Sequence, residues 1–461
     1  MIKDLRQKIG QTVTIAGWVS VRRNQGKMVF FDFRDMSGTI QGVVLPASGA
    51  MKEAKILRPE YVVSATGEVV KRREENVQKG KENGDLELRV ENIVILNSSE
   101  TPPFDVTEDT SLINEEARLE YRYIDLRSER MQRNIRMRSE FVRRVREFLF
   151  EKSFTEIETP LLSESTPEGS RDFVVPSRLH LGSFYALPQS PQQYKQLLMV
   201  GGFERYFQIA RCVRDEDLRA DRGFEHSQVD IEMSFVEQDD IMSIVEEMMI
   251  KTSEGMGFAI KEKPFPKFTY DEAMEKFGSD KFDLRTEEDK AKGILAYAWV
   301  YKFPFFAKAD DGSWTFTHNP FSKTVDEDAE LLMKKKNIEK ILTAQYDLVC
   351  NGYETAGGSI REHRPEYLKK VYEVMGYSGE EIEERIGHML KAFTYGAPPH
   401  GGIAIGIERI LMTLTGEKYL REVQAFPMTR GGQTAVMKAP KPLTEAQLRE
   451  LGISISKKSR K

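Results

Sequence analysis

The stretch from residue 205 to 235 holds the densest group of side chains that could do chemistry. It is expected to form two strands joined by a highly charged loop, and this loop carries Arg214, Glu216, Arg219 and Arg222. Alternation along the second strand separates a polar face from a mostly apolar one. The polar face comprises His226, Gln228, Asp230, Glu232 and Ser234. Because guanidinium groups pair with phosphate oxygens, the arginines predict a polyphosphate-binding surface, the alternative being a polar face turned to solvent.

Two carboxylates further along the chain are suited to a metal ion. Asp347 and Glu354 would provide oxygen ligands for magnesium, a hard cation that bridges phosphates. Their spacing places them on opposite faces of an ideal strand, so the pairing requires a bulge or twist near Asn351 and Gly352. An ion pair on the surface is the alternative.

A glycine-bearing segment follows these carboxylates. Residues 401–410, GGIAIGIERI, are expected to run from a strand into a helix. Ala404, Gly406 and Glu408 would share a face of small residues that lets a ligand approach the backbone closely. Such segments are common, so this one is informative only because it follows the charged strand pair of 205–235 and the carboxylates Asp347 and Glu354.

The elements that position these groups are expected to follow a separate N-terminal domain. Residues 13–97 form short alternating apolar stretches between Gly-rich or charged turns, which predicts a small β-barrel. Apolar residues at helical spacing then predict a long amphipathic helix: Met137, Phe141, Val145, Phe148 and Leu149. No regular βαβ alternation follows, so we expect an α+β fold with an antiparallel sheet flanked by helices. The expected boundaries are a barrel at 1–100, a linker or hinge at 101–130, and a catalytic domain at 131–461.

One strand of the barrel has a face that could read single-stranded nucleic acid. In residues 28–35, Val29, Phe31 and Phe33 would face the core, while Phe30 and Asp32 would lie on the opposite face. An exposed aromatic ring beside hydrogen-bonding groups is what an unpaired base needs. The alternative is a phenylalanine covered by a loop.

Composition limits the class of protein. A chain of 461 residues is too long to fold around a single hydrophobic core. Its net charge of -5 argues against a protein that coats nucleic acid non-specifically. The two cysteines, Cys212 and Cys350, have no zinc-like spacing. No apolar run is long enough for a membrane span, and the charged N-terminus lacks the apolar core of a signal peptide, so a cytoplasmic protein is expected.

Three segments resemble the motifs of class II aminoacyl-tRNA synthetases: two are described above, and the third is FTEIETPLL at 154–162. Nearly the whole chain resembles the bacterial aspartyl-tRNA synthetases. Residues 205–235 are similar to motif 2, 401–410 to motif 3, and 154–162 to motif 1. The resemblance implies activation of L-aspartate with ATP, its transfer to tRNA(Asp), and a homodimer with Pro160 at its interface. Whether tRNA(Asn) is also aspartylated stays open.

The motif residues imply an ATP site. Arg214 would clamp the α-phosphate, Glu216 would hold the adenine side, and Arg409 would contact the terminal phosphate. The ATP site implied also contains His226, Gln228, Glu354 and Gly406, with Asp347 and Glu354 as the Mg²⁺ ligands. His226 replaces the usual phenylalanine of the family, and Glu408 replaces its frequent aspartate.

Two other segments, 189–195 and 352–361, resemble those that recognise aspartate in this family. Lys195 and Arg361 would bind the β-carboxylate of the substrate, which needs fixed cations. The residues implied around its ammonium group are Glu168, Ser190, Gln192 and Asp230. The resemblance also implies that His318 belongs to the aspartate site. Bacterial enzymes usually have two histidines at 318 and 319, and this chain has Asn319 at the second position.

In the barrel, the resemblance implies an OB-fold that reads the anticodon. Phe30 would stack on an anticodon base, with Arg23, Gln41 and Glu87 nearby.

One departure from the bacterial pattern is large. These enzymes normally insert an extra domain between motifs 2 and 3, whereas here the chain runs almost directly from 282–285 into 295–306. The insertion is therefore expected to be absent near 285–295, and activity is expected to survive because the motifs lie on both sides. Asparaginyl- and lysyl-tRNA synthetases and a non-catalytic tRNA-binding paralogue are the alternatives; Lys195 with Arg361 favours a carboxylate substrate.

Overall fold

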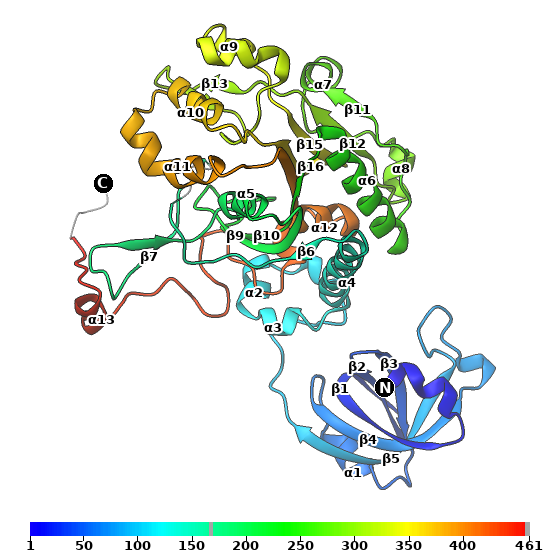
Figure 1. The fold of residues 1–461 in the computed structure, drawn as a ribbon. Helices are drawn as coiled ribbons and strands as arrows, with labels where there is room; N and C mark the ends of the chain where they lie inside the picture. The colour runs from blue at the N-terminus through cyan, green and yellow to red at the C-terminus, as the bar shows by residue number, and fades with distance from the viewer. Residues whose placement is uncertain (166–168, 457–461) are drawn as a thin grey trace. The chain divides into compact units, whose positions relative to one another are not determined.

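The computed structural model describes residues 1–165 and 169–456, and the chain divides into two compact units, Met1–Glu129 and Arg130–Lys461 (Figure 1). Each unit has its own hydrophobic core.

The first unit contains a closed five-stranded barrel in the order β1-β2-β3-β5-β4. The strands are β1 (Thr12–Gln25), β2 (Met28–Asp35), β3 (Gly38–Val44), β4 (Val62–Lys71) and β5 (Leu86–Asn97). Its helices are α1 (Met51–Ile56), α2 (Glu115–Glu120) and α3 (Arg122–Asp125). Val29, Phe31 and Phe33 are buried in the barrel core, which confirms the predicted alternation of β2.

The second unit is built on an eight-stranded sheet in the order β11-β12-β15-β16-β17-β10-β9-β6. Its strands are β6 (Thr155–Glu156), β9 (Arg205–Val213), β10 (Glu225–Ser234), β11 (Lys267–Thr269), β12 (Tyr297–Tyr301), β15 (Gln345–Cys350), β16 (Tyr353–Ile360) and β17 (His400–Gly406). The pairs are antiparallel except at the two edges, where β11 pairs with β12 and β6 with β9 in parallel. Two small hairpins complete the strands: β7 (Val174–Pro176) with β8 (Phe184–Ala186), and β13 (Phe306–Lys308) with β14 (Trp314–Phe316).

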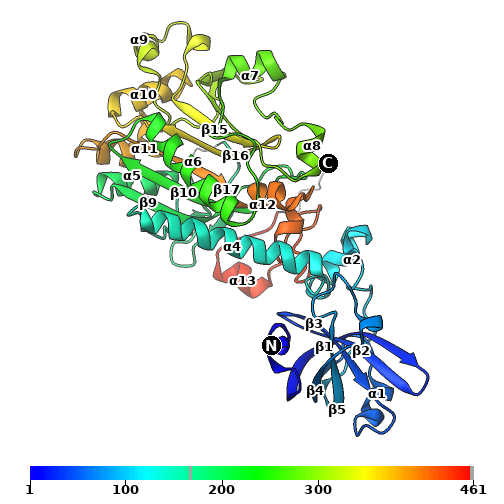
Figure 2. The same cartoon turned by 90° about the vertical axis from the view of Figure 1, so that its right-hand side faces the viewer.

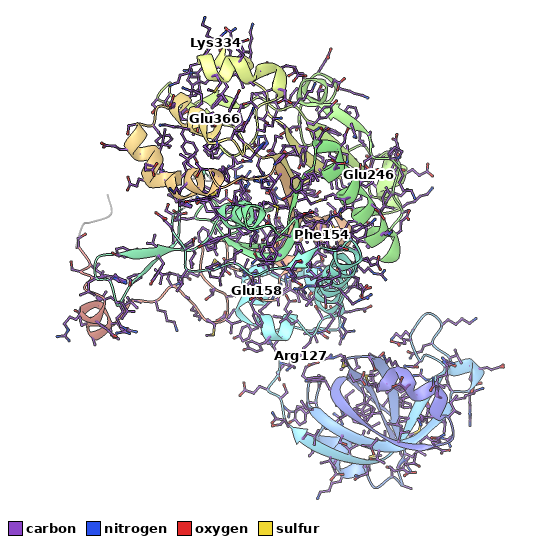
Figure 3. All side chains as sticks on the ribbon, viewed as in Figure 1. Arg127, Phe154, Glu158, Glu246, Lys334 and Glu366 are labelled. Atoms are coloured by element: carbon purple, nitrogen blue, oxygen red, sulfur yellow. The ribbon has the colours of Figure 1, made fainter. Side chains whose placement is uncertain are left out.

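Helices surround this sheet, and the α+β class that was predicted is confirmed. They are α4 (Glu129–Glu151), α5 (Gln192–Val200), α6 (Gln238–Gly255), α7 (Tyr270–Phe277), α8 (Glu287–Ala291), α9 (Ala329–Lys334), α10 (Pro365–Val374), α11 (Gly379–Phe393), α12 (Ile407–Thr415) and α13 (Glu445–Glu450). In Figure 3, Lys334 of α9 points outward from the unit, whereas Phe154, only 4% exposed, belongs to the core. Among the described residues, no helix combines the length and apolarity needed to cross a bilayer.

The main core lies on one face of the large sheet. Helices α4 and α6 run along this face (Figure 2). The apolar stripe of α4 includes the predicted Phe141, Val145, Phe148 and Leu149, which are buried against residues of α6 and α12. From β10, the side chains of Val229, Ile231 and Met233 enter the same core. The alternate residues of β10 therefore face the opposite side of the sheet.

Candidate active site

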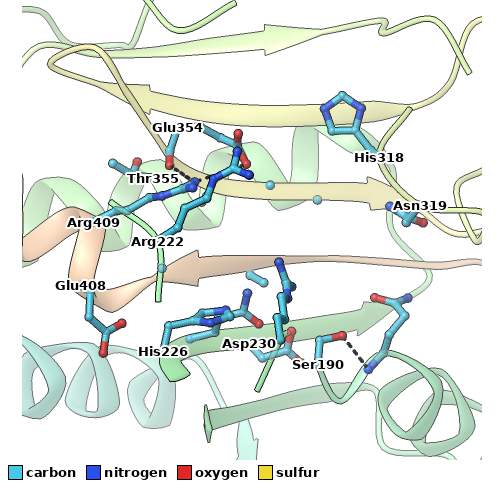
Figure 4. Close-up of a pocket in the computed structure, with 18 of the residues that line it drawn as sticks. Ser190, Arg222, His226, Asp230, His318, Asn319, Glu354, Thr355, Glu408 and Arg409 are labelled. Carbon is cyan, nitrogen blue, oxygen red and sulfur yellow. Dashed lines mark hydrogen bonds and ion pairs between the residues drawn. The ribbon is translucent and has the colours of Figure 1, made fainter. Parts of the chain in front are cut away.

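A cavity of about 240 Å³ lies on the polar side of the large sheet, between β10, β16, β17 and α5 (Figure 4). All the predicted ATP and aspartate residues that the structure describes line it: Ser190, Gln192, Lys195, Arg214, Glu216, His226, Gln228, Asp230, His318, Glu354, Arg361, Gly406 and Arg409. Glu168, the remaining predicted residue, lies outside the described part of the chain. Side chains far apart in sequence are thus brought to one charged cavity.

A cluster of alternating charges forms one wall of the cavity. Lys195 Nζ lies 2.6 Å from Asp230 Oδ1 and 3.3 Å from Glu232 Oε2. Arg361 donates to both oxygens of Glu232, through Nε at 3.0 Å and Nη2 at 3.1 Å, and through Nη1 to Ser359 Oγ at 2.8 Å. All four charged side chains are almost completely buried.

Burial and pairing shift the pKa values within this cluster in different directions. Burial raises the pKa of Asp230, although Lys195 opposes the rise. Burial would also raise the pKa of Glu232, but Arg361 and Lys195 outweigh it and hold that pKa below its ordinary value. The pKa of Arg361 is raised, because the favourable pairing with Glu232 exceeds the cost of burial. Glu232 is therefore held as a carboxylate between two cations.

Glycines of the neighbouring strands leave space for Glu232 of this cluster and for a second carboxylate, Asp347. A Cβ on Gly402 would lie 2.0 Å from Glu232 Oε2 and 2.1 Å from the carbonyl oxygen of Ile231. A Cβ on Gly357 would lie 3.0 Å from Asp347 Oδ1. The glycines of β16 and β17 thus allow carboxylates to lie against the sheet backbone.

Arginines gather at the other end of the cavity, where Figure 4 shows Arg222, Arg409 and Glu354 together. Arg409 donates from Nη1 to the carbonyl oxygen of Glu354 at 3.0 Å, and its Nη2 lies 3.3 Å from Asp221 Oδ2. Arg222 Nη1 lies 3.6 Å from Glu216 Oε2. These guanidinium groups are partly exposed, so an anion entering the cavity can reach them.

Two side chains beside this end have clear local roles. The pKa of His226 is lowered to about 3, by burial and then by the nearby Arg214 and Arg409, so its ring is neutral at pH 7. A neutral imidazole beside the arginines can stack on a flat ligand, as phenylalanine would. Glu408 lies in the first turn of α12 and pairs with Arg138 at 2.9 Å while accepting from the backbone N–H of Ser227 at the same distance. Glu408 therefore lies in the helix and ties it to β10 and α4, instead of continuing the strand face of Ala404 and Gly406.

Asp347 and Glu354 lie on the adjacent antiparallel strands β15 and β16. Asn351 and Gly352, both with positive φ, connect these strands, and a register shift occurs between Leu348 and Val349. The predicted irregularity near residues 351 and 352 is thus a hairpin turn, while the bulge lies further along the ladder.

The two carboxylates differ in their surroundings. Glu354 lines the cavity and pairs with Lys281 at 2.7 Å; burial would raise its pKa, but Lys281 and Arg409 lower it overall. Asp347 is 2% exposed, accepts from Gln345 Nε2 at 2.7 Å, and lies 3.3 Å from His318 Nε2. The described residues contain no group of three or more His, Cys, Asp or Glu side chains placed for a metal ion. The donors nonetheless fit Mg²⁺, which is often held by one or two carboxylates together with substrate phosphates.

Several residues at the site were not assigned roles from sequence. Glu232 was placed on the polar face, but its pairing with both Lys195 and Arg361 was not predicted. Asp221, Gln345 and Asn319 also line the cavity. Strand alternation was the available signal for Glu232, whereas no sequence signal indicated the position of Gln345.

The barrel brings its four predicted anticodon residues onto one surface. Arg23 is opposite Phe30 on β1 and β2, and Gln41 is opposite both Asp32 of β2 and Glu87 of β5. Arg23 donates to both oxygens of Asp32, at 2.8 and 3.1 Å. Phe30 is only half-buried. An aromatic ring and several hydrogen-bonding groups therefore share one face of the barrel.

Comparison with known proteins identifies the family of this chain. Residues 114–430 match the tRNA synthetases class II (D, K and N), and residues 13–96 match the OB-fold nucleic acid binding domain. The chain belongs to the class II tRNA synthetases. This synthetase is 39% identical to the aspartate–tRNA(Asp/Asn) ligase of Rubrobacter xylanophilus, over 97% of this chain and 95% of the relative. It is 37% identical to the ligase of the same name from Bacillus subtilis, over 99% and 98% of the two chains.

Solved structures of synthetases share the fold. The aspartyl-tRNA synthetase of Entamoeba histolytica has a TM-score of 0.74 at 24% identity, over 93% of this chain and 90% of that one. The asparaginyl-tRNA synthetase of Pyrococcus horikoshii, complexed with asparaginyl-adenylate, has a TM-score of 0.72 at 23% identity, over 92% and 96%.

The synthetase is shorter than its sequence relatives. The alignment with the Rubrobacter protein runs over 573 positions, more than the 461 residues present here. The relative therefore contains residues without a counterpart in this chain. At the predicted position of the missing domain, 285–295, the structure has only the short helix α8.

Proposed function

We propose that this synthetase is an aspartate–tRNA ligase, which activates L-aspartate with ATP and transfers it to tRNA(Asp). The observation that carries the proposal is the buried pair of cations, Lys195 and Arg361, in the wall of the cavity. A side-chain carboxylate finds matching charge there, whereas the ammonium group of lysine would be repelled. The names of the relatives, at 39% and 37% identity over nearly the full chain, support the same substrate.

The cavity residues suggest how the first reaction proceeds. The α-carboxylate of aspartate attacks the α-phosphorus of ATP in line, an aspartyl-adenylate forms, and pyrophosphate leaves. In this proposal Arg214 stabilises charge on the α-phosphate, Glu216 and His226 lie beside the adenine, and Arg409 contacts the terminal phosphate. No protein base is needed, because the attacking carboxylate is already ionised, and positioning with charge stabilisation supplies the rate enhancement.

Magnesium fits the same end of the cavity. Glu354, with Asp347 behind it, would hold Mg²⁺ together with phosphate oxygens, and the bound ion would neutralise phosphate charge. The Glu354 carboxylate is also paired with Lys281, at 2.7 Å.

Transfer to tRNA completes the reaction. A hydroxyl of the 3′-terminal ribose attacks the aspartyl carbonyl carbon, an ester forms, and AMP leaves. The barrel face with Phe30, Arg23, Gln41 and Glu87 is proposed to bind the anticodon, since stacking and edge contacts are how unpaired bases are recognised. Whether tRNA(Asn) is accepted as well depends on this face.

We propose in addition that the synthetase is a homodimer of the cytoplasm. Pro160, which follows the edge strand β6, is exposed, and the neighbouring Leu161 and Leu162 are each 53% exposed. An apolar surface of this kind favours association. Light scattering of the purified chain tests it: a mass near twice 52.9 kDa supports the dimer, and a monomer that stays active contradicts it.

The substrate is tested by ATP–pyrophosphate exchange with the purified full chain. We expect aspartate alone to stimulate exchange. Equal stimulation by asparagine or lysine would contradict the proposed substrate. Arg214→Ala should abolish exchange, whereas Arg385→Ala, an exposed arginine of α11, should not change it.

The tRNA partner is tested with transcripts of tRNA(Asp) and tRNA(Asn). Charging of tRNA(Asp) with aspartate supports the proposal, and charging of both transcripts assigns the broader specificity. Binding without charging of either transcript would instead indicate a protein that only binds RNA.

A further inference from the structure

A line of hydrogen bonds connects the cavity to a histidine buried behind it. Gln192, on α5 and at the cavity wall, donates from Nε2 to Oε1 of Gln196 at 3.1 Å. Gln196 Nε2 lies 3.1 Å from Nε2 of His400, at the start of β17. His400 Nδ1 lies 2.7 Å from the carbonyl oxygen of Pro398. Gln196 and His400 are completely buried, and Gln192 is 7% exposed.

The carbonyl oxygen of Pro398, at the inner end of this line, determines which group donates and which accepts in every hydrogen bond. A backbone carbonyl oxygen only accepts, so His400 carries its proton on Nδ1 and donates to Pro398. Burial, the largest effect, lowers the pKa of His400 to about 4, so the ring is neutral and Nε2 is an acceptor. Gln196 must then present its amide nitrogen to His400, which turns its oxygen toward Gln192. Gln192 must in turn donate its own amide nitrogen to that oxygen.

The outer end of the line is thereby set as an acceptor. With Nε2 of Gln192 used by Gln196, its Oε1 accepts no hydrogen bond from the described residues. Gln192 lines the cavity together with Asp230 and Ser190, two of the other residues expected around the substrate ammonium. An oxygen in this place attracts an ammonium group, whereas the NH₂ group of a flipped amide would repel it.

We propose that His400 is a positioning residue for amino-acid binding: through Gln196, its single tautomer holds the amide of Gln192 with the oxygen toward the substrate ammonium. The proposal rests on the proposed function and on the expectation from sequence that Gln192 lies at the substrate ammonium. His400 itself is not among the residues that line the cavity. It acts on the substrate only through the two glutamines.

The test is a double-mutant cycle in aspartate-dependent ATP–pyrophosphate exchange with the full chain. His400→Leu removes the acceptor for Gln196, so the Gln192 amide loses its orientation. We expect the KM for aspartate to rise about tenfold or more, because a hydrogen bond to a charged group is lost. The kcat and the KM for ATP should change less than about threefold, since the arginine end of the cavity is untouched. In a Gln192→Ala background, His400→Leu should add almost nothing.

A conservative variant separates positioning from a purely structural role. His400→Gln places an amide oxygen near the former Nε2, so it should accept from Gln196 and keep the KM for aspartate near that of the wild type. Should His400→Leu fail to fold, Gln196→Met breaks the same line one residue closer to the cavity and is expected to raise the KM equally.

The outcomes are distinct. Wild-type chain that shows no aspartate-dependent exchange refutes the proposed function itself. Active wild type with the same KM increase from His400→Leu in both backgrounds overturns the positioning role. So do an equal rise in the KM for ATP and a His400→Gln variant as impaired as His400→Leu.

Discussion

Arg361 holds both carboxylate oxygens of Glu232, at 3.0 and 3.1 Å, in a place where neither side chain is more than 3% exposed. Removing one partner of such a pair is costly, because an uncompensated charge remains buried. Lys195 approaches the same carboxylate at 3.3 Å. Glu232 thus holds in position both cations that we propose to bind the substrate carboxylate.

Arg361→Lys tests whether this geometry, and not charge alone, binds the substrate. A single ammonium group cannot satisfy Glu232, Ser359 and a substrate carboxylate together, whereas the guanidinium fork can. We expect the kcat/KM for aspartate to fall about 100-fold, with the KM for ATP nearly unchanged. Arg364→Lys is the matched control, since Arg364 also pairs with a carboxylate, that of Glu362, but does not line the cavity. Equal losses in both variants would contradict the assignment.

Gly402→Ala and Gly406→Ala, two changes on the same strand, should have opposite consequences. A Cβ at residue 402 meets a backbone oxygen at 2.1 Å, which cannot move away, so we expect the second unit to lose about 1–3 kcal/mol or more of unfolding free energy. At residue 406 the nearest atom is 3.7 Å away, and stability should be retained. Because Gly406 lines the cavity, its variant should instead raise the KM for ATP. Thermal unfolding measures the stability, and exchange kinetics measure the KM for ATP. A stable and active Gly402→Ala variant would contradict the predicted steric clash at residue 402.

Phe30→Ala should weaken charging of tRNA without affecting activation of aspartate. Loss of one base stack costs about 1–3 kcal/mol, so the KM for tRNA(Asp) is expected to rise about 10- to 100-fold. ATP–pyrophosphate exchange should be unchanged, because the barrel takes no part in it. Phe30→Tyr keeps the ring and should behave as the wild type. If Phe30→Ala charges tRNA normally, the base does not stack there.

Acid should destabilise the second unit partly through His400. Its pKa is lowered from 6.5 to about 4 in the folded chain, chiefly by burial, while Glu232 raises it and Arg361 and His363 lower it further. The unfolded chain therefore binds the proton more tightly. The contribution of this pKa shift to the free energy of unfolding is fully present above pH 6.5. It is lost as the pH falls toward 4, by a total of about 3 kcal/mol.

His400→Gln is the comparison that isolates this contribution. Urea unfolding at several values between pH 7 and pH 4.5 should show a smaller loss of stability in the variant than in the wild type, since other groups titrate alike in both. Parallel curves would mean that His400 does not change its protonation on unfolding.

Much of this synthetase was predictable from local pattern. The alternation in 226–235 predicted which side chains of β10 lie on the side of the sheet opposite the core, and the spacing in α4 predicted its buried stripe. Both follow from the periods of strand and helix, which depend only on neighbouring residues. The candidate ATP and aspartate residues that the structure describes, taken from motif resemblance, all line one cavity.

The sequence by itself determined the fold class, the family and the residue types available at the site. Only the tertiary structure decided how they combine: Glu232 with Arg361 across 129 positions, Gln196 with His400 across 204, and the bulge and turn that arrange Asp347 and Glu354. These contacts depend on the order and register of strands and on space left by glycines such as Gly402. Long-range packing determines the geometry of these contacts, and it cannot be predicted from the local periodicity of the sequence.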